Sequence, residues 1–220
     1  MPDPVGRAGL GRLAPTDGGL RAVQQRVLRS FAGSGTPPAA ASLDEAAAPF
    51  GAGGREVLAR LHAADFLRLD AAGRISAAYP FPAVPTPHVV RIEGGPAVFS
   101  MCAVDSLGIT PMLGTTVTIS SAEPGTGTLI TITVPASGMS AVWEPSGTIV
   151  FDGELASCGP APDAVVPSVA ADTCCGAINF FTSRKSARAW AAAHPEVTGR
   201  TLSQEDAGRR HPPLRSSPAR

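Results

Sequence analysis

Residues 115–135 read TTVTISSAEPGTGTLITITVP and contain the clearest β-sheet pattern in the chain. Threonine, valine and isoleucine alternate on both sides of a short segment rich in proline and glycine, which is typical of two antiparallel strands joined by a turn. Two further strand patterns, HVVRIEG and PAVFSM, precede this pair, and two weaker ones, SAVWEP and GTIVF, follow it. The stretch therefore predicts a mostly antiparallel sheet in the second half of the chain.

The residues before this sheet show helical spacing instead. Apolar side chains recur every three or four residues from Leu20 to Phe31. Ser42 and Glu45 form a capping-box pattern that predicts the start of a second helix at Ser42. A third helix is expected over residues 55–65, and the following FLRLDAAGRISAAY is typical of a hairpin.

We therefore expect an α+β fold with two domains. Three helices and a hairpin outline a winged-helix-like domain over residues 18–80, and the proline-rich YPFPAVPTPH marks its boundary. A mostly antiparallel β-sheet domain with short packed helices is expected over residues 81–210. Composition predicts a flexible N-terminus over residues 1–17 and a disordered tail over residues 211–220.

Charge and hydropathy argue against two classes of partner. The 220 residues carry 18 basic and 18 acidic side chains, so the net charge gives no reason to bind nucleic acid or an anionic membrane. The third expected helix, REVLARLHAAD, balances its two arginines against two acidic residues, which favours a structural module over a DNA reader. Neither an apolar run of ~18 residues nor a secretory signal is present, so we expect a cytoplasmic protein with reduced thiols.

Two cysteine segments carry the chemistry. The first, FSMCAVDSLGITPMLG, places Cys102 and Asp105 at i and i+3, on one face of a short helix that we expect to be broken near Pro111. A thiol at a helix N-terminus is expected to have a lowered pKa. A carboxyl group beside thiols in apolar surroundings is expected to have a raised pKa, so that it can hold a proton.

The second segment, DTCCGAINFFTS, contains the vicinal pair Cys174 and Cys175. Successive side chains of an extended chain point in opposite directions, so only one of the two thiols is expected to face Cys102. The cysteines also have a simpler interpretation as small packing residues in an apolar core. Cys158 lies in a long irregular segment, where we expect an exposed thiol without a role, and the spacing of the cysteines does not fit a structural zinc site.

The two segments resemble those of the alkylmercury lyases, or organomercurial lyases, of bacterial mercury resistance. CAVDSLGITPMLG and CCGAINFF carry the likeness, which extends over about residues 85–211. The resemblance implies that Cys102 and Cys174 are the catalytic thiols and mercury ligands, and that Asp105 is the catalytic carboxylate and a third ligand. It implies that Cys175 is a neighbour the family does not strictly need. Met101 stands where an aromatic residue often precedes the first cysteine.

The implied reaction is protonolysis of R–Hg–X to R–H and Hg(II). Cys102 would attack mercury, Cys174 would add as second ligand, and a proton relayed through Asp105 would reach carbon. The reaction needs reduced thiols and no other cofactor. The expected partners are organomercurial substrates, with a mercuric reductase or a low-molecular-weight thiol as acceptor of Hg(II), and the protein is expected as a monomer or homodimer.

Two other functions remain open from sequence. The chain could be a soft-metal sensor with a winged-helix module, or a carrier that holds Hg(II) or Cu(I) without catalysis. Asp105 favours the enzyme over the carrier, because a carrier needs thiols but has no use for a proton donor. The neutral charge argues against the DNA binding that a sensor requires.

Overall fold

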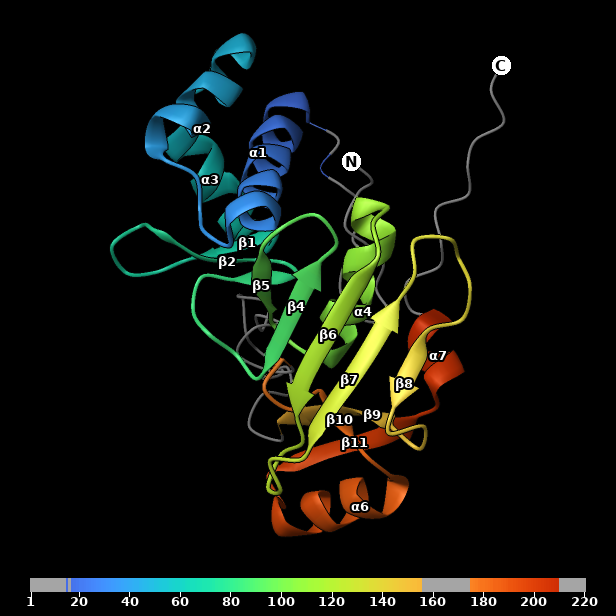
Figure 1. Cartoon of the computed structure of the whole chain (residues 1–220). Coiled ribbons are helices and arrows are strands. Elements are labelled where there is room, and N and C mark those ends of the chain that lie inside the picture. The colour runs from blue at the N-terminus through green and yellow to red at the C-terminus, as the bar shows by residue number, and fades with distance from the viewer. Residues whose placement is uncertain (1–14, 16, 156–174, 210–220) are drawn as a thin grey trace.

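The structure is a computed structural model and describes residues 15, 17–155 and 175–209. The flexible segment predicted over residues 1–17 lies almost entirely outside the described residues, and the tail predicted over residues 211–220 lies wholly outside them. Helices occur together with antiparallel sheets, so the prediction of an α+β fold is confirmed (Figure 1). Among the described residues, no helix combines the length and apolar character needed to cross a bilayer.

The first helices pack together at the N-terminal end. They are α1 (Gly18–Ser34), α2 (Ala40–Ala47), the short η1 (Ala48–Phe50) and α3 (Gly54–Ala63). Asp17 caps α1, because its Oδ1 accepts hydrogen bonds from the amides of Gly19 and Leu20 at 2.9 and 3.0 Å. The second helix begins at Ala40, so the prediction that it starts at Ser42 is wrong. Alanine is the best helix former, and the run of alanines before Ser42 is already helical.

A small antiparallel sheet follows the helices. It contains β1 (Leu67–Leu69), β2 (Ile75–Ala78) and β3 (Phe81–Pro82) in that order. Leu67 pairs with Ala78, and the Asp70 carboxylate closes the turn by accepting from the amides of Ala72 and Arg74, both at 2.9 Å. The hairpin predicted in residues 66–79 is therefore present.

The largest sheet has five antiparallel strands in the order β5-β4-β6-β7-β8. Val117, Ile119, Ile130 and Ile132 are fully buried, and Ile119 pairs directly with Ile132. This alternation buries one face of the sheet, as the pattern in residues 115–135 predicts. The strands are β4 (His88–Ile92), β5 (Ala97–Ser100), β6 (Val117–Ala122), β7 (Leu129–Val134) and β8 (Val142–Glu144).

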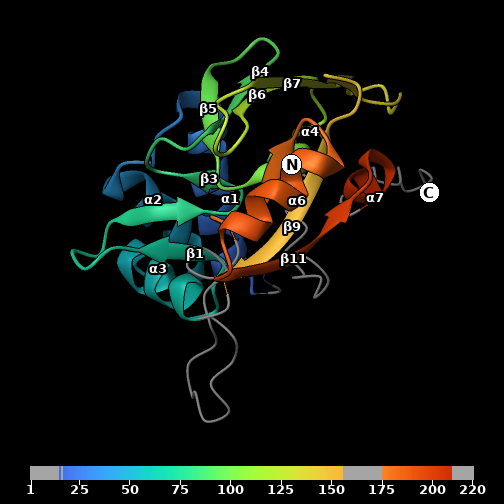
Figure 2. The same cartoon turned by 90° about the horizontal axis from the view of Figure 1, so that it is seen from below.

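A second antiparallel sheet has the order β10-β9-β11, and helix α6 lies across it (Figure 2). Trp190 of α6 packs on Phe151 and Phe181 in a small separate core. Gly153 and Gly199 face each other between β9 and β11. A Cβ atom on Gly199 would lie 2.5 Å from the Asp152 carbonyl oxygen, so the strands meet too closely there for a side chain. The elements are β9 (Ile149–Leu155), β10 (Asn179–Phe181), α6 (Arg184–Ala193) and β11 (Val197–Leu202).

Helix α4 (Ala103–Leu113) packs against both large sheets and contributes five side chains to the main core: Ala103, Val104, Leu107, Ile109 and Met112. The helix continues through Pro111 to Leu113 and ends at Gly114, which adopts φ +68°. The prediction that it breaks near Pro111 is therefore wrong. A proline in the last turn removes only one backbone donor, so the helix continues to its glycine cap.

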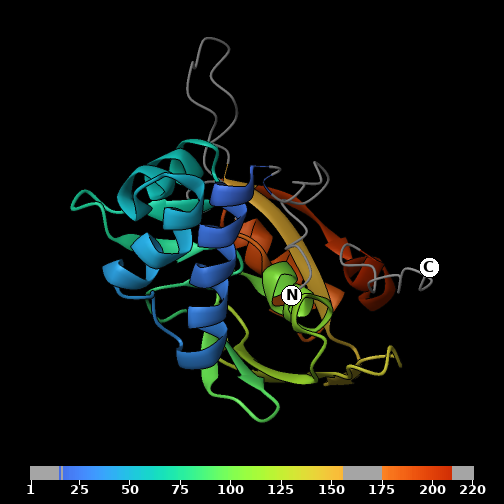
Figure 3. The same ribbon diagram turned by 90° about the horizontal axis from the view of Figure 1, so that it is seen from above.

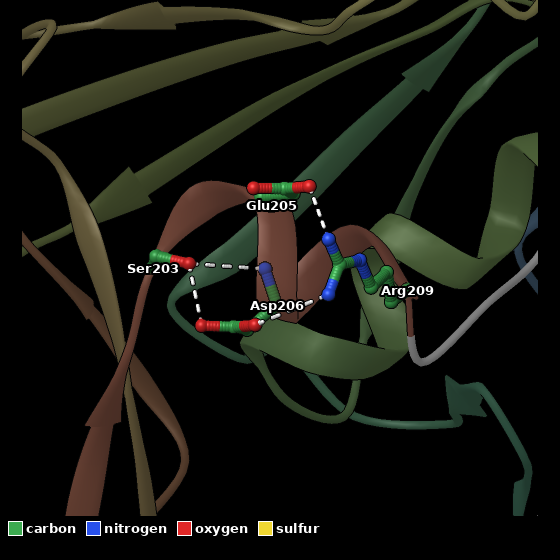
Figure 4. Close-up of polar contacts among 4 residues, drawn as sticks. All are labelled: Ser203, Glu205, Asp206 and Arg209. Atoms are coloured by element: carbon green, nitrogen blue, oxygen red, sulfur yellow. Dashed lines mark hydrogen bonds and ion pairs between the residues drawn. The ribbon is translucent and has the colours of Figure 1, made fainter.

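The last described helix, α7 (Gln204–Arg209), lies on the opposite side of the molecule from the N-terminal helices (Figure 3). Ser203 caps it, because the Ser203 hydroxyl accepts from the Asp206 amide at 3.1 Å and donates to the Asp206 carboxylate at 2.6 Å (Figure 4). That hydroxyl and the nearby arginines lower the pKa of Asp206. Arg209 also pairs with Glu205 one turn earlier.

Candidate functional site

Cys102 lies where β5 gives way to α4, in the core of the molecule. It is the N-cap of α4, and its thiol sulfur accepts a hydrogen bond from the Asp105 amide at 3.4 Å. The side chain is 3% exposed. Backbone hydrogen bonds fix the residues on either side, because the Met101 amide donates to the Pro80 carbonyl and the Ala103 amide donates to the Ile178 carbonyl. The thiol is therefore held on a rigid junction between three segments of the chain.

Asp105 lies in the first turn of α4, on the face that Cys102 shares. The Cys102 thiol donates a hydrogen bond to Asp105 Oδ2 at 3.2 Å, so the predicted proximity of these two groups is observed. Burial raises the pKa of the Asp105 carboxyl to about 6, and the hydrogen bond from Cys102 opposes part of this rise. The predicted direction of this shift is confirmed, and the group can hold or release a proton close to neutral pH.

Cys175 completes a cluster with these two residues. The Sγ atoms of Cys102 and Cys175 and a carboxylate oxygen of Asp105 all lie within 4.8 Å of one another. Cys175 is partly exposed and occupies the turn that leads into β10. The cluster therefore joins a buried thiol and a carboxylate on one helix to a more accessible thiol from a distant part of the chain.

The Cys102 thiol has a strongly raised pKa. Burial is the largest cause, and the hydrogen bond to Cys175 and the nearby Asp105 carboxylate act in the same direction. The Asp105 amide lowers the pKa, as expected at a helix N-terminus, but its effect is smaller than the others. The prediction of a lowered pKa for Cys102 is therefore wrong. Without a metal the Cys102 thiol is neutral. It loses its proton when its sulfur atom bonds to a soft metal.

Cys174 and Cys158 lie outside the described residues, so the catalytic role predicted for Cys174 stays a prediction. Among the described residues, the thiol beside Cys102 is that of Cys175, which the family resemblance implies is not strictly needed. Strand alternation could not identify it, because residues 175–177 form a turn and Cys175 precedes the strand.

A cavity of about 460 Å³ lies beside Cys175. Arg68 and Ser76 of the small N-terminal sheet and Asp70 of its turn form one part of the wall, and Thr86 and Met101 form another. The N-terminal hairpin and the segment after it therefore both line the space in front of the partly exposed thiol.

The chemistry of the cluster is that of a soft-metal site with its own proton carrier. Soft metals bind thiolates in preference to other side chains. Two thiolates suit such a metal in a linear or bent arrangement. The carboxyl group with a pKa near 6 can take the proton that a thiol loses on metal binding and pass it on. The fold and the cluster thus fit the class of thiol-dependent proteins that act on soft metals.

Comparison with known proteins identifies the family. The model of the alkylmercury lyase family matches residues 81–210. An alkylmercury lyase of Staphylococcus epidermidis is 32% identical over 168 residues, which are 75% of this chain and 70% of that protein. An alkylmercury lyase of Pseudomonas putida is 35% identical over 112 residues, which are 51% of this chain and 48% of that protein. The chain belongs to the alkylmercury lyase family of enzymes.

A solved structure supports the fold independently. The mercury-bound form of MerB2 superposes with a TM-score of 0.67 and covers 90% of this chain and 89% of that one, at 22% sequence identity. At this identity the likeness concerns the fold. It extends over nine-tenths of the chain.

Proposed function

We propose that this protein cleaves the carbon–mercury bond of organomercurials, R–Hg–X, with Cys102, Cys175 and Asp105 as the reacting groups. The observation that carries the proposal is the cluster of two thiols and a carboxyl group within 4.8 Å. The hydrogen bond from the Cys102 thiol to Asp105 Oδ2 gives the proton a direct path. Membership of the family supports the reaction class.

The first step is capture of mercury. R–Hg–X enters beside Cys175, the Cys102 sulfur bonds to mercury, and the bond between mercury and X breaks. The Cys102 proton passes along its 3.2 Å hydrogen bond to Asp105. Cys175 then adds as the second sulfur ligand, and its proton leaves with X as H–X.

The second step is protonolysis. Two sulfur ligands donate electron density to mercury and weaken its bond to carbon, because thiolates are strong soft donors. Asp105 gives its proton to carbon, the electron pair of the mercury–carbon bond forms R–H, and Hg(II) stays on the two thiolates. The sum is R–Hg–X plus two thiols going to R–H, H–X and a dithiolate complex of Hg(II).

Cys174 is the alternative second thiol, because it directly precedes Cys175 in the sequence. Hg(II) leaves to a low-molecular-weight thiol or a mercuric reductase, and the cytoplasm supplies the reducing conditions that free thiols need. The N-terminal helices and hairpin form a winged-helix-like unit over residues 18–80 that supports the catalytic unit over residues 81–210.

The test is benzene release from phenylmercury in the presence of excess thiol, with serine in place of one cysteine at a time. We expect Cys102→Ser and Cys175→Ser to lose at least about 100-fold in kcat, because a hydroxyl is a poor mercury ligand. Cys174→Ser and the control Cys158→Ser are expected to retain activity. If Cys174→Ser loses activity and Cys175→Ser retains it, the second mercury ligand is Cys174.

A different result would change the reaction class. Wild-type protein that binds Hg(II) tightly and releases no benzene would contradict the lyase proposal. A carrier or sensor of soft metals would then be the better account of the same cluster.

A further inference from the structure

Asn179 is a buried amide at the start of β10 that the reaction scheme does not use. It is 7% exposed, and its Nδ2 donates a hydrogen bond to the Gly176 carbonyl oxygen at 3.0 Å. Gly176 directly follows Cys175 in the turn over residues 175–177. A Cβ atom on Gly176 would meet nothing within 4 Å, so the turn has open space beside it there. Side-chain packing therefore does not restrain the turn at Gly176, and the hydrogen bond from the Asn179 amide holds it there.

The residue before Asn179 makes the matching contact with the other thiol segment. The Ile178 carbonyl accepts from the amide of Ala103 at 3.1 Å, and Ala103 directly follows Cys102. Two consecutive residues thus tie the two thiol segments to one short piece of backbone. A shift of this piece would change the separation of the two sulfur atoms.

His88 of the five-stranded sheet lies beside Asn179. Its ring is 2% exposed, its Nδ1 lies 2.9 Å from the Ser121 hydroxyl, and the ring makes an edge-to-face contact with Phe180. Burial lowers the pKa of His88 to about 4, and the Asn179 side chain opposes part of this shift.

His88 and Ser121 form a buried polar pair, with 2.9 Å between the His88 Nδ1 and the Ser121 hydroxyl, and Asn179 lies beside it. The Asn179 amide nitrogen donates to the Gly176 carbonyl. Because these side chains are all buried, their polar contacts restrict the rotamer of Asn179.

We propose that Asn179 is a positioning residue, which braces the turn after Cys175 through its hydrogen bond to Gly176 and so sets the Cys175 thiol at ligand distance from Cys102. The inference rests on the proposed function, because it concerns the same pair of thiols. Asn179 touches no reacting atom. Its contribution is the geometry with which the second sulfur meets mercury.

The consequence is a specific division of kinetic effects. Cys102 and Asp105 do not contact Asn179 in this network, so the first capture of mercury is expected to survive its loss. The second ligation needs Cys175 in place, and small misplacements of reacting groups are costly. We expect kcat to fall while KM for phenylmercury changes little.

The experiment compares Asn179→Ala and the shape-conserving Asn179→Leu with the wild type. Gln204→Ala is the matched control, because the Gln204 amide also donates to backbone carbonyls, those of Ser146 and Thr148, at 2.8 and 3.0 Å. Steady-state benzene release gives kcat and KM. The ultraviolet charge-transfer absorbance of one equivalent of Hg(II) reports how many thiolates bind the metal, and thermal unfolding reports the fold.

We expect both Asn179 variants to lose at least about tenfold in kcat, with KM within about twofold and a weaker thiolate absorbance. Gln204→Ala is expected to keep all three values. Wild-type kcat and absorbance in Asn179→Leu, or equal losses in Gln204→Ala, would overturn the inference. The absorbance comparison needs no turnover, so a wild type without benzene release would refute the proposed function and still leave the role of Asn179 decided.

Discussion

The thiol of Cys102 donates a hydrogen bond to the carboxylate of Asp105 across 3.2 Å, within a single turn of α4. The donor is the group that must lose a proton on binding mercury, and the acceptor is the group that must later supply one. Asp105 therefore takes part in two proton transfers of the proposed reaction, the loss from Cys102 and the gain at carbon.

The first prediction concerns the pH dependence of capture. Below the Asp105 pKa of about 6 the carboxyl group is already protonated and cannot accept the proton of Cys102. We therefore expect kcat/KM for phenylmercury to fall as pH decreases through about 6. The residual activity of Asp105→Asn is expected to show no such fall. Rates measured from about pH 5 to about pH 8 check this. A wild-type profile that stays flat through this range contradicts the role of Asp105 as acceptor.

The second prediction concerns the stability cost of that carboxyl group. Its pKa is raised from 3.8 to about 6 in the folded protein, so the folded state binds the proton more tightly than the unfolded state does. The free energy of unfolding therefore falls as pH rises from about 4 to about 6. Above that range the total loss is at most about 3 kcal/mol. Asp105→Asn removes this loss, so we expect it to stabilise the protein at about pH 8 and to be close to neutral at about pH 4.

Urea unfolding at the two pH values measures this difference. An equal change in the free energy of unfolding at both would show that Asp105 has an ordinary pKa. A gain confined to the higher pH would show that the protein gives up stability for its proton carrier.

The third prediction concerns Glu123, which directly follows β6 of the five-stranded sheet and caps the start of α6. Its Oε1 accepts from the amide and hydroxyl of Thr182 at 3.0 and 3.1 Å, and from the Ser186 hydroxyl, while Thr126 donates to Oε2 at 2.7 Å. Burial tends to raise the pKa of this carboxyl, but the hydrogen bonds outweigh it and lower the pKa. A lowered pKa stabilises the fold above the unfolded value, and this contribution is lost as pH falls through the folded value.

We expect Glu123→Ala to cost about 2 kcal/mol at neutral pH, because it leaves several partly buried donors without their partner, and to cost less in acid. Urea unfolding measures the cost. The exposed Glu196 provides the control, since Glu196→Ala is expected to stay within about 0.5 kcal/mol. A change of similar size in both variants would contradict the role of Glu123 as a cap.

The fourth prediction concerns the close approach of β9 and β11. A Cβ atom on Gly199 would lie 2.5 Å from the Asp152 carbonyl oxygen and 2.7 Å from the Gly153 Cα. We expect Gly199→Ala to destabilise the protein by about 2 kcal/mol, because two backbones must separate. Gly208→Ala is the control, since a Cβ atom there meets nothing within 4 Å. Thermal unfolding of the two variants checks this, and an unchanged midpoint in Gly199→Ala would contradict the contact.

Most of the fold follows from local sequence patterns. The alternation in residues 115–135 predicts β6 and β7, because one face of an antiparallel pair must be apolar. The spacing of apolar residues from Leu20 predicts α1. The boundaries at Ser42 and Pro111 are wrong because each depends on one residue, whereas neighbouring alanines and a glycine cap decide where the helices begin and end.

The candidate site is only half predictable. Cys102 and Asp105 lie one helical turn apart, so a local rule brings them together. The partner thiol depends on a turn ahead of β10, and no sequence period describes a turn. Burial likewise decides the pKa of Cys102, and burial is a property of the whole packed core.

The hydrogen bond from Met101 to Pro80 bears on how this catalyst can be transplanted. The family match begins at residue 81, yet the carbonyl that anchors the residue before Cys102 lies one position earlier. The wall of the cavity also includes side chains from the hairpin before that position. A designer who grafts the proposed site for carbon–mercury bond cleavage onto another scaffold must therefore include the N-terminal hairpin. The segment that is needed is longer than the one that the family model matches.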